Sequence, residues 1–138
     1  YNMFDRKPER GLFDTLLAHG VGSIVFSPLA GGLLTGRYLD GKAPAGSRAA
    51  EGRWFTEDAL NDTYLARARA LNDIAAARGQ SLAQLALTWV LRQPAVTSAL
   101  IGASSVAQLD NNLDALSAAP LSAEELSAIE PLAVDGTK

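Results

Sequence analysis

Apolar residues follow two different periods in the first part of the chain. They keep helical spacing over residues 12–17, between Pro8, which suits a first helical turn, and Gly20, which suits the position after a helix. Residues 21–26 then form an apolar run without alternation, as in a parallel strand covered on both faces. A short apolar and aromatic run at residues 1–4 predicts one more buried strand.

The second half of the chain shows the start and stop signals of helices. A long helix is predicted from Asp62 or Thr63 to a stop at Gly79, with an apolar stripe at Leu65, Ala68, Leu71, Ile74 and Ala75. A strand is predicted over residues 96–101. Three serines, each followed three residues later by Gln or Glu, indicate capping boxes that begin further helices: Ser81 with Gln84, Ser105 with Gln108, and Ser122 with Glu125.

This order of elements predicts an α/β fold. Strands that alternate with helices form parallel sheets with right-handed crossovers. Three parallel strands alone would leave edges and one face uncovered, so we interpret the chain as a segment of a larger (β/α) barrel. The chain begins at Tyr1 without an initiator Met, and we expect the true start to lie upstream; a trimmed chain is the alternative.

Composition narrows the range of partners. The 138 residues are 48% hydrophobic and 20% charged, which is typical of a globular protein. The net charge is -3 and no basic cluster occurs, so no nucleic-acid partner is expected. No apolar run is long enough for a membrane span. The absence of cysteine excludes disulfides and suits a cytoplasmic protein.

Two loops at predicted strand ends have the residue types that approach phosphate groups. The first, Phe26 to Gly32, offers an aromatic ring, the Ser27 hydroxyl and small residues whose backbone a pyrophosphate could approach, and Arg37 and Arg48 follow it. A tight turn with two solvated arginines is the alternative. In a parallel barrel, ligands meet the loops that follow the carboxyl ends of the strands.

The second loop, Gly102 to Ser105, opens a helix. Unpaired N–H groups and a partial positive charge at a helix N-terminus suit a phosphate, and Gln108 and Asn112 lie one and two turns along the same face. Ordinary capping by a serine, with two exposed amides, remains the alternative. Neither loop has the pattern of a Walker loop or of a GxGxxG fingerprint.

No catalytic constellation or metal-ligand spacing is visible in the sequence. His19 is the only histidine and is interpreted as a surface residue near a helix end. Tyr38, Asp40 and Lys42 are interpreted as solvated loop residues. Trp54 and Phe55, in the same long loop, could line a substrate pocket or pin the loop to the barrel.

The whole chain resembles the aldo-keto reductases. The run from Gly22 to Tyr38 resembles their seventh strand and its loop, the run from Leu100 to Asn112 resembles their eighth strand and helix, and Tyr1 to Arg6 resembles the sixth strand. The pattern is most similar to the branch with bacterial glyceraldehyde 3-phosphate reductases and potassium-channel β subunits. The resemblance implies that residues 1–138 form the carboxy-terminal part, about strands six to eight, of a (β/α)8 TIM barrel truncated on its N-terminal side.

The resemblance also implies a role for each matching position in binding NADP(H). Phe26 would stack on the nicotinamide, and Ser27, Pro28, Leu29, Ala30, Gly31 and Gly32 would wrap the pyrophosphate. Arg37 would reach the phosphates and Arg48 would close over the adenosine end. Gly102, Ser104 and Gln108 would meet the region of the 2′-phosphate, and Asn112 the adenine. Asn111 departs from the family, in which Glu is usual, and the preference for NADP over NAD rests on Arg37 and Arg48.

The family's catalytic tetrad of Asp, Tyr, Lys and His has no matching position here, and neither has the strand glutamine that holds the nicotinamide amide. The resemblance implies a parent enzyme that reduces aldehydes or ketones, whereas this chain alone is expected to be inactive. The alternatives are a regulatory module of the channel β-subunit type or an inactive half-barrel. The expected partner is a small carbonyl substrate, and the oligomeric state stays open.

Overall fold

The described part of the chain consists of a pair of parallel strands and the helices that pack against them. The computed structural model describes residues 1–47, 50, 52 and 57–137. The strands are β1 (Ser23–Phe26) and β2 (Val96–Leu100), paired in parallel with Phe26 opposite Leu100. The α-helices are α1 (Leu12–Ala18), α3 (Asp62–Ala77), α4 (Leu82–Leu91), α5 (Val106–Leu113) and α6 (Ala123–Ile129). The 3₁₀ turns are η1 (Lys7–Glu9), η2 (Ala30–Gly32), η3 (Gly36–Tyr38), η4 (Glu57–Leu60) and η5 (Asp114–Ser117).

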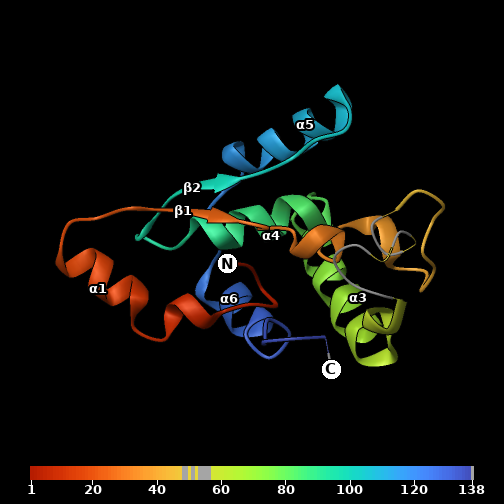
Figure 1. The fold of residues 1–138 in the computed structure, drawn as a ribbon, viewed down its shortest axis with the longest axis horizontal. Helices are drawn as coiled ribbons and strands as arrows, with labels where there is room; N and C mark the ends of the chain where they lie inside the picture. Colours follow the sequence, from red (N-terminus) through yellow and green to blue (C-terminus); the bar gives the residue numbers. More distant parts are fainter. Residues whose placement is uncertain (48–49, 51, 53–56, 138) are drawn as a thin grey trace.

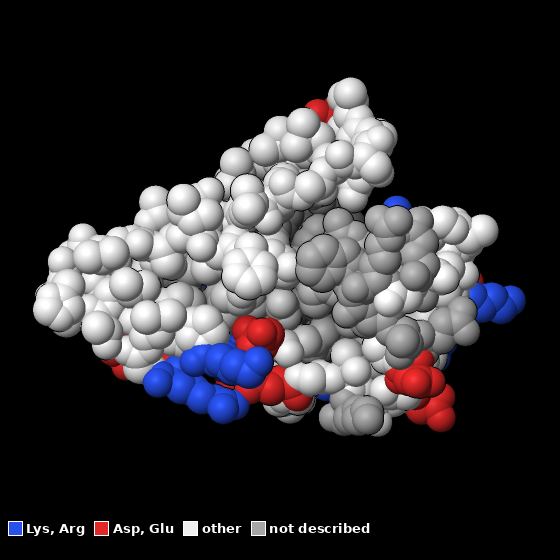
Figure 2. All heavy atoms as spheres, in the orientation of Figure 1, with Lys and Arg blue, Asp and Glu red and all other residues white. Residues whose placement is uncertain are grey.

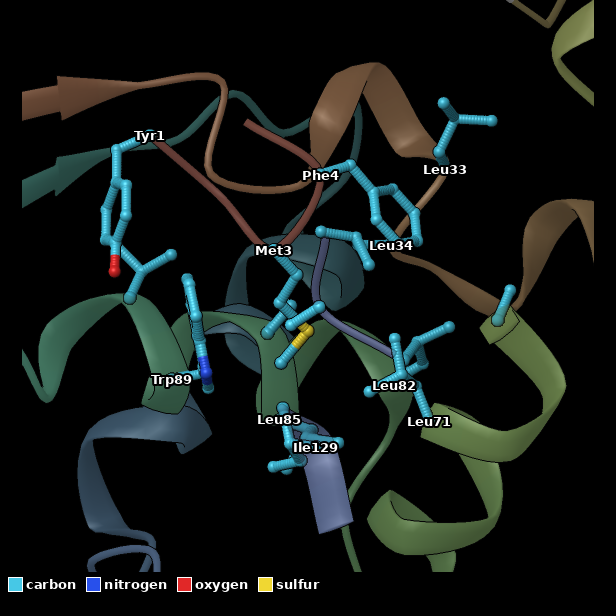
Figure 3. Close-up of a cluster of buried hydrophobic side chains, with 14 of the residues drawn as sticks. Tyr1, Met3, Phe4, Leu33, Leu34, Leu71, Leu82, Leu85, Trp89 and Ile129 are labelled. Atoms are coloured by element: carbon cyan, nitrogen blue, oxygen red, sulfur yellow. The ribbon is translucent and has the colours of Figure 1, made fainter. Parts of the chain in front are cut away.

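The core surrounds helix α4, which lies beneath the two strands in Figure 1. Its apolar side chains face almost every direction, and Leu85, Trp89 and Val90 are at most 1% exposed. Figure 3 shows Met3, Leu71 and Ile129 converging on this helix from three other parts of the chain. Removing a buried leucine from such a core costs about 2–5 kcal/mol. Burial around α4 is therefore what holds these distant segments together.

The capping signals placed most helices correctly. The predicted capping boxes of Ser81 and Ser122 are both formed. Ser105 caps α5 by accepting from the Gln108 N–H, but the Gln108 side chain bonds to Ser104 instead of returning to Ser105. Helix α3 is capped by Asn61, one residue before the predicted Asp62 or Thr63, because the Asn61 Oδ1 accepts from the Tyr64 N–H at 3.0 Å.

The strand predicted at residues 1–4 is wrong. The chain turns back on itself there, with Asn2 and Asp5 exchanging backbone hydrogen bonds of 3.2 and 3.1 Å. The Asn2 Oδ1 also accepts from the Phe4 N–H at 2.8 Å. A short polar side chain that bonds to the backbone two residues on stabilises a turn, and this local bonding prevails over the apolar pattern.

The described residues cover the sheet on one face only, as expected for a few parallel strands taken alone. Val25 is buried towards the helices, whereas Ile24 and Phe26 are 72% and 71% exposed. Leu100, opposite Phe26, is also exposed. Both faces of β1 are apolar, so the sequence pattern fits two covers, and the described helices supply one of them.

Helix α5 projects from the body of the molecule on the far side of the two strands from α4, as Figure 1 shows. Several apolar side chains along α5 and the following turn are exposed, with Val106 at 75% and Leu116 at 70%. Figure 2 shows few charged side chains on this projecting part, whereas Lys, Arg, Asp and Glu gather on the lower part of the same view.

Two arginine clusters fasten the ends of the chain to the helices. Arg67 of α3 is 8% exposed and donates to the carbonyl oxygens of Leu132, Val134 and Gly136 at 2.9, 2.5 and 2.9 Å. Its guanidinium also lies 4.5 Å from the centre of the Phe4 ring. Burial lowers the pKa of Arg67, which means that these contacts hold a charge partly removed from water.

The second cluster centres on the Glu9 carboxylate. It accepts hydrogen bonds from Tyr1 and from Arg6, and it pairs with Arg92, which lies 3.7 Å above the Trp89 ring. Burial opposes ionisation of Glu9, but hydrogen bonds from Tyr1 and Arg6 and the charges of Arg6 and Arg92 hold its pKa below the usual range.

Candidate functional site

The two loops predicted to approach phosphate groups lie at the same edge of the sheet. Because β1 and β2 are parallel and Phe26 is paired with Leu100, the loop after Phe26 and the loop after Ile101 leave adjacent strand ends. Figure 1 shows the two segments that follow β1 and β2 leaving the sheet on the side where α5 begins. Polar and small residues from two segments, more than seventy positions apart in the sequence, are therefore brought together.

The first loop has an unusual backbone. Ser27 and Ala30 have φ values of 52° and 49°, and they are the described non-glycine residues with positive φ. Left-handed conformations of such residues cost on the order of 1–3 kcal/mol each and occur at functional sites. Gly31 and Gly32 continue the turn with φ values of 68° and 111°. The loop therefore presents its backbone, with the Ser27 side chain exposed, in a conformation that local preferences oppose.

Packing below the loop maintains this conformation. Leu33 and Leu34 are buried directly after it, and Pro28 is buried within it. The hydroxyl of Tyr64, from α3, donates to the Leu33 carbonyl oxygen at 2.9 Å. A Cβ at Gly32 would lie 3.3 Å from the ring of Tyr38, so the backbone and the ring are packed too closely there to leave room for a side chain.

Two residues at the start of the chain support the loop from the other side, and the sequence pattern did not identify them as site residues. The Tyr1 nitrogen donates to the Phe26 carbonyl oxygen at 3.3 Å, and the Asn2 Nδ2 donates to the Ser27 carbonyl oxygen at 3.0 Å. Asn2 is 6% exposed. A buried polar residue is informative only once its partner is known, and here the partner is 25 residues away.

The second loop forms a compact start to α5. The Ser104 N–H and hydroxyl both donate to the Gln108 Oε1, at 2.8 and 2.9 Å, and Ser105 is the N-cap. Gly102 and Ser104 are exposed, and a Cβ built on Gly102 would meet nothing within 4 Å. Gln108 is thus engaged with its own loop, while the helix N-terminus faces solvent beside it.

Asn112 and Asn111 have different surroundings. Asn112 is 3% exposed, and its Nδ2 has no hydrogen-bond partner among the residues that the structure describes. Asn111, at the position where the resemblance implies Glu, turns towards α4. Its Nδ2 donates to the Ser81 hydroxyl oxygen at 3.2 Å, and its backbone carbonyl oxygen accepts from the Gln84 Nε2 at 2.9 Å. Asn111 therefore joins α5 to the start of α4.

Of the two arginines that follow the first loop, one lies within the described residues and the other lies outside them. Arg37 is exposed in η3, where the Thr35 hydroxyl accepts from its N–H at 3.3 Å. Arg48, Trp54 and Phe55 lie outside the described residues.

Asp40 and Lys42 are exposed as expected, but Tyr38 is fully buried, so its interpretation as a solvated residue is wrong. The apolar contacts of its ring with the strand-end loop outweigh exposure of its hydroxyl.

Neither a metal centre nor a membrane span stands out. No group of three or more His, Cys, Asp or Glu residues within the described part of the chain is arranged to hold a metal ion. His19 caps the exposed end of α1, away from both loops. None of the described helices has the length and apolar character to cross a membrane.

Comparisons with known proteins agree with this geometry. Residues 1–133 match the model of the aldo/keto reductase family. The L-glyceraldehyde 3-phosphate reductase of Escherichia coli strain K12 is 45% identical over 140 residues, which cover 99% of this chain and 40% of the relative. A probable voltage-gated potassium channel subunit beta of Oryza sativa subsp. japonica is 38% identical over 129 residues, covering 91% of this chain and 39% of the relative.

Solved structures match the fold as well. An aldo-keto reductase from Bacillus halodurans in its holo form superimposes with a TM-score of 0.68 at 32% identity, covering 96% of this chain and 40% of that one. The predicted fold class, part of a (β/α)8 barrel, is confirmed by this match. The chain spans about two fifths of the length of the curated relatives it matches. The chain belongs to the aldo/keto reductase family, whose model it matches over residues 1–133.

Proposed function

We propose that this chain is the cofactor-binding, carboxy-terminal part of an NADP(H)-dependent oxidoreductase that reduces aldehydes or ketones to alcohols. The observation that carries the proposal is the adjacency of the two strand-end loops, one with a strained backbone and one opening α5. A dinucleotide has an aromatic end, a pyrophosphate and a second phosphate region, and it needs sites for all three along one edge. Family membership supports the use of a nicotinamide cofactor.

The described residues fit such a ligand. The Phe26 ring is 71% exposed at the strand end, where a nicotinamide could stack on its face. Residues 27–32 offer a turning backbone whose two larger side chains, Pro28 and Leu29, are buried or half-buried, and the α5 N-terminus suits a phosphate. Asn112 is assigned the adenine, as the resemblance implies, and its buried Nδ2 has to become accessible for this contact. We assign Gly102, Ser104, Gln108 and Arg37 the roles that the resemblance implies, and Arg48, which lies outside the described residues, likewise.

NADPH would supply the hydride, and the residues of this chain would bind and orient it. We assign proton transfer to the part of the relatives' length that this chain does not span, because the resemblance gives the tetrad no matching position here. The same part would cover the exposed sheet residues Ile24 and Leu100 and leave the Phe26 ring at the strand end for the cofactor. We place the protein in the cytoplasm.

Titration of the chain with NADPH tests this proposal. Binding should be detected by calorimetry, and Phe26→Ala should weaken it about tenfold, since it removes a stacking surface. Leu116→Ala is the matched control, because it truncates an equally exposed apolar side chain away from both loops. A folded chain that binds no NADPH at millimolar concentration, or binds it equally well after Phe26→Ala, would refute the proposed function.

A regulatory module of the channel β-subunit type is the second candidate, and the 38% identity to such a subunit favours it. Such a module would share the proposed cofactor site and differ in the rest of the protein. A parent sequence with the complete tetrad and turnover of a simple aldehyde would favour the reductase. NADPH binding without turnover in the parent protein would favour the module.

A further inference from the structure

Asn2 is a buried residue whose hydrogen bonds are directed at the strained loop. Its Oδ1 accepts from the Phe4 N–H at 2.8 Å, while its Nδ2 donates to the Ser27 carbonyl oxygen at 3.0 Å. Its backbone groups pair with Asp5. Each polar group of Asn2 therefore has a partner. If the side-chain amide were flipped, its NH2 group would face the Phe4 N–H and its oxygen would face the Ser27 carbonyl oxygen, and both hydrogen bonds would be lost. The side chain has one permitted orientation.

The Ser27 carbonyl receives two donors. The Ala30 N–H donates to it at 3.0 Å within the turn, and the Asn2 Nδ2 donates to it from another segment. A carbonyl oxygen has two lone pairs, so both are used. The peptide plane between Ser27 and Pro28 is thereby fixed at the residue where φ is 52° and local preference is least favourable.

From these contacts, we infer that Asn2 is a positioning residue that holds the Ser27–Gly32 backbone in the conformation that receives the dinucleotide pyrophosphate. The inference rests on the proposed function for its ligand. The conformation of the loop itself is set by contacts within the chain and is independent of the proposed function. Asn2 touches no cofactor in this scheme and acts through the Ser27 carbonyl.

Asn2→Asp is the sharpest variant. It keeps the oxygen that accepts from Phe4 and replaces the donor by a carboxylate oxygen that repels the Ser27 carbonyl. Asn2→Ala removes the donor without adding charge, and it decides the test if the Asp variant does not fold. Ser122→Ala is the control, because loss of the α6 cap costs about 1 kcal/mol of stability at a site away from both loops.

Two ligands separate positioning from general damage. NADPH contains the pyrophosphate, whereas adenosine 2′,5′-bisphosphate contains only the adenosine end proposed for the α5 loop. Asn2→Asp should weaken NADPH about tenfold and leave the bisphosphate within about twofold of the parent chain. Ser122→Ala should leave both unchanged. Equal loss for both ligands, or unchanged NADPH affinity, would overturn the inference.

Carbon-13 chemical shifts of Ser27 and Ala30, measured without any ligand, report backbone conformation directly. They should move away from left-handed values in Asn2→Asp and stay unchanged in Ser122→Ala. If the parent chain binds no NADPH, the proposed function fails and these shifts still judge Asn2. Shifts unaffected by Asn2→Asp and by Asn2→Ala would show that Asn2 does not hold the loop.

Discussion

Replacing Arg67 by Met should release the carboxy-terminal segment from the body of the protein. The guanidinium donates to three backbone carbonyl oxygens in that segment, those of Leu132, Val134 and Gly136. Met keeps an apolar stem of similar length, which can still pack on the Phe4 ring, but it cannot donate. The change therefore isolates the hydrogen bonds from the packing.

The expected loss follows from those contacts. Hydrogen bonds to a charged group contribute about 1.5–3 kcal/mol each, so three of them set an upper bound of several kcal/mol. Two effects reduce the loss. Burial of the guanidinium, which lowers the Arg67 pKa, already costs stability, and the carbonyls of the exposed residues Val134 and Gly136 can bond to water once released. We expect a net decrease of about 3 kcal/mol in the free energy of unfolding.

Urea denaturation and hydrogen exchange measure the two consequences. Arg69→Met is the matched control: it makes the same substitution in the same helix, where an exposed guanidinium donates to one carbonyl, that of Leu39, and it should cost less than about 1 kcal/mol. The Gly136 N–H, which donates to the Phe4 carbonyl, should lose protection in Arg67→Met only. Equal losses of stability in the two variants would refute the reasoning.

Three further changes test other contacts. Glu9→Gln should destabilise the protein by about 2 kcal/mol at pH 7, and the difference should disappear as pH falls from about 4.5 through the lowered pKa of Glu9, as followed by denaturation at several pH values. Gly32→Ala should lower the free energy of unfolding by about 1–2 kcal/mol, because φ is 111° and the Tyr38 ring is close; Gly102→Ala, with open space, is its control. Ser81→Ala should lower the melting temperature by removing the α4 capping box, at a cost of about 1 kcal/mol; the comparison is wild type.

The elements that depend on local signals could be predicted from the sequence. Capping boxes at Ser81 and Ser122 act over three residues, so the pattern contains the whole interaction. The adjacency of the two strand-end loops also follows from the order of strands and helices, because parallel strands place their carboxyl ends together.

The contacts that support the site could not be predicted in this way. Asn2 reaches Ser27 across 25 positions, and Arg67 reaches Gly136 across 69. An apolar run at residues 1–4 indicated a strand, since periodicity does not register that one Asn side chain can bond to its own turn. The mistake and the missed residue therefore have one cause, which is the role of the Asn2 side chain.

The backbone of the first loop shows why the site depends on the assembled fold. Ser27 and Ala30 adopt left-handed conformations although neither is glycine, so local preference and tertiary structure disagree there. Asn2, Tyr64 and the buried residues after the loop come from three separate segments, and together they offset the strain. A loop held in this way loses its shape when any of these segments detaches. We therefore expect cofactor affinity to fall under mild denaturing conditions before the helices around α4 unfold, because the loop conformation relies on a few contacts whereas many buried side chains hold the core.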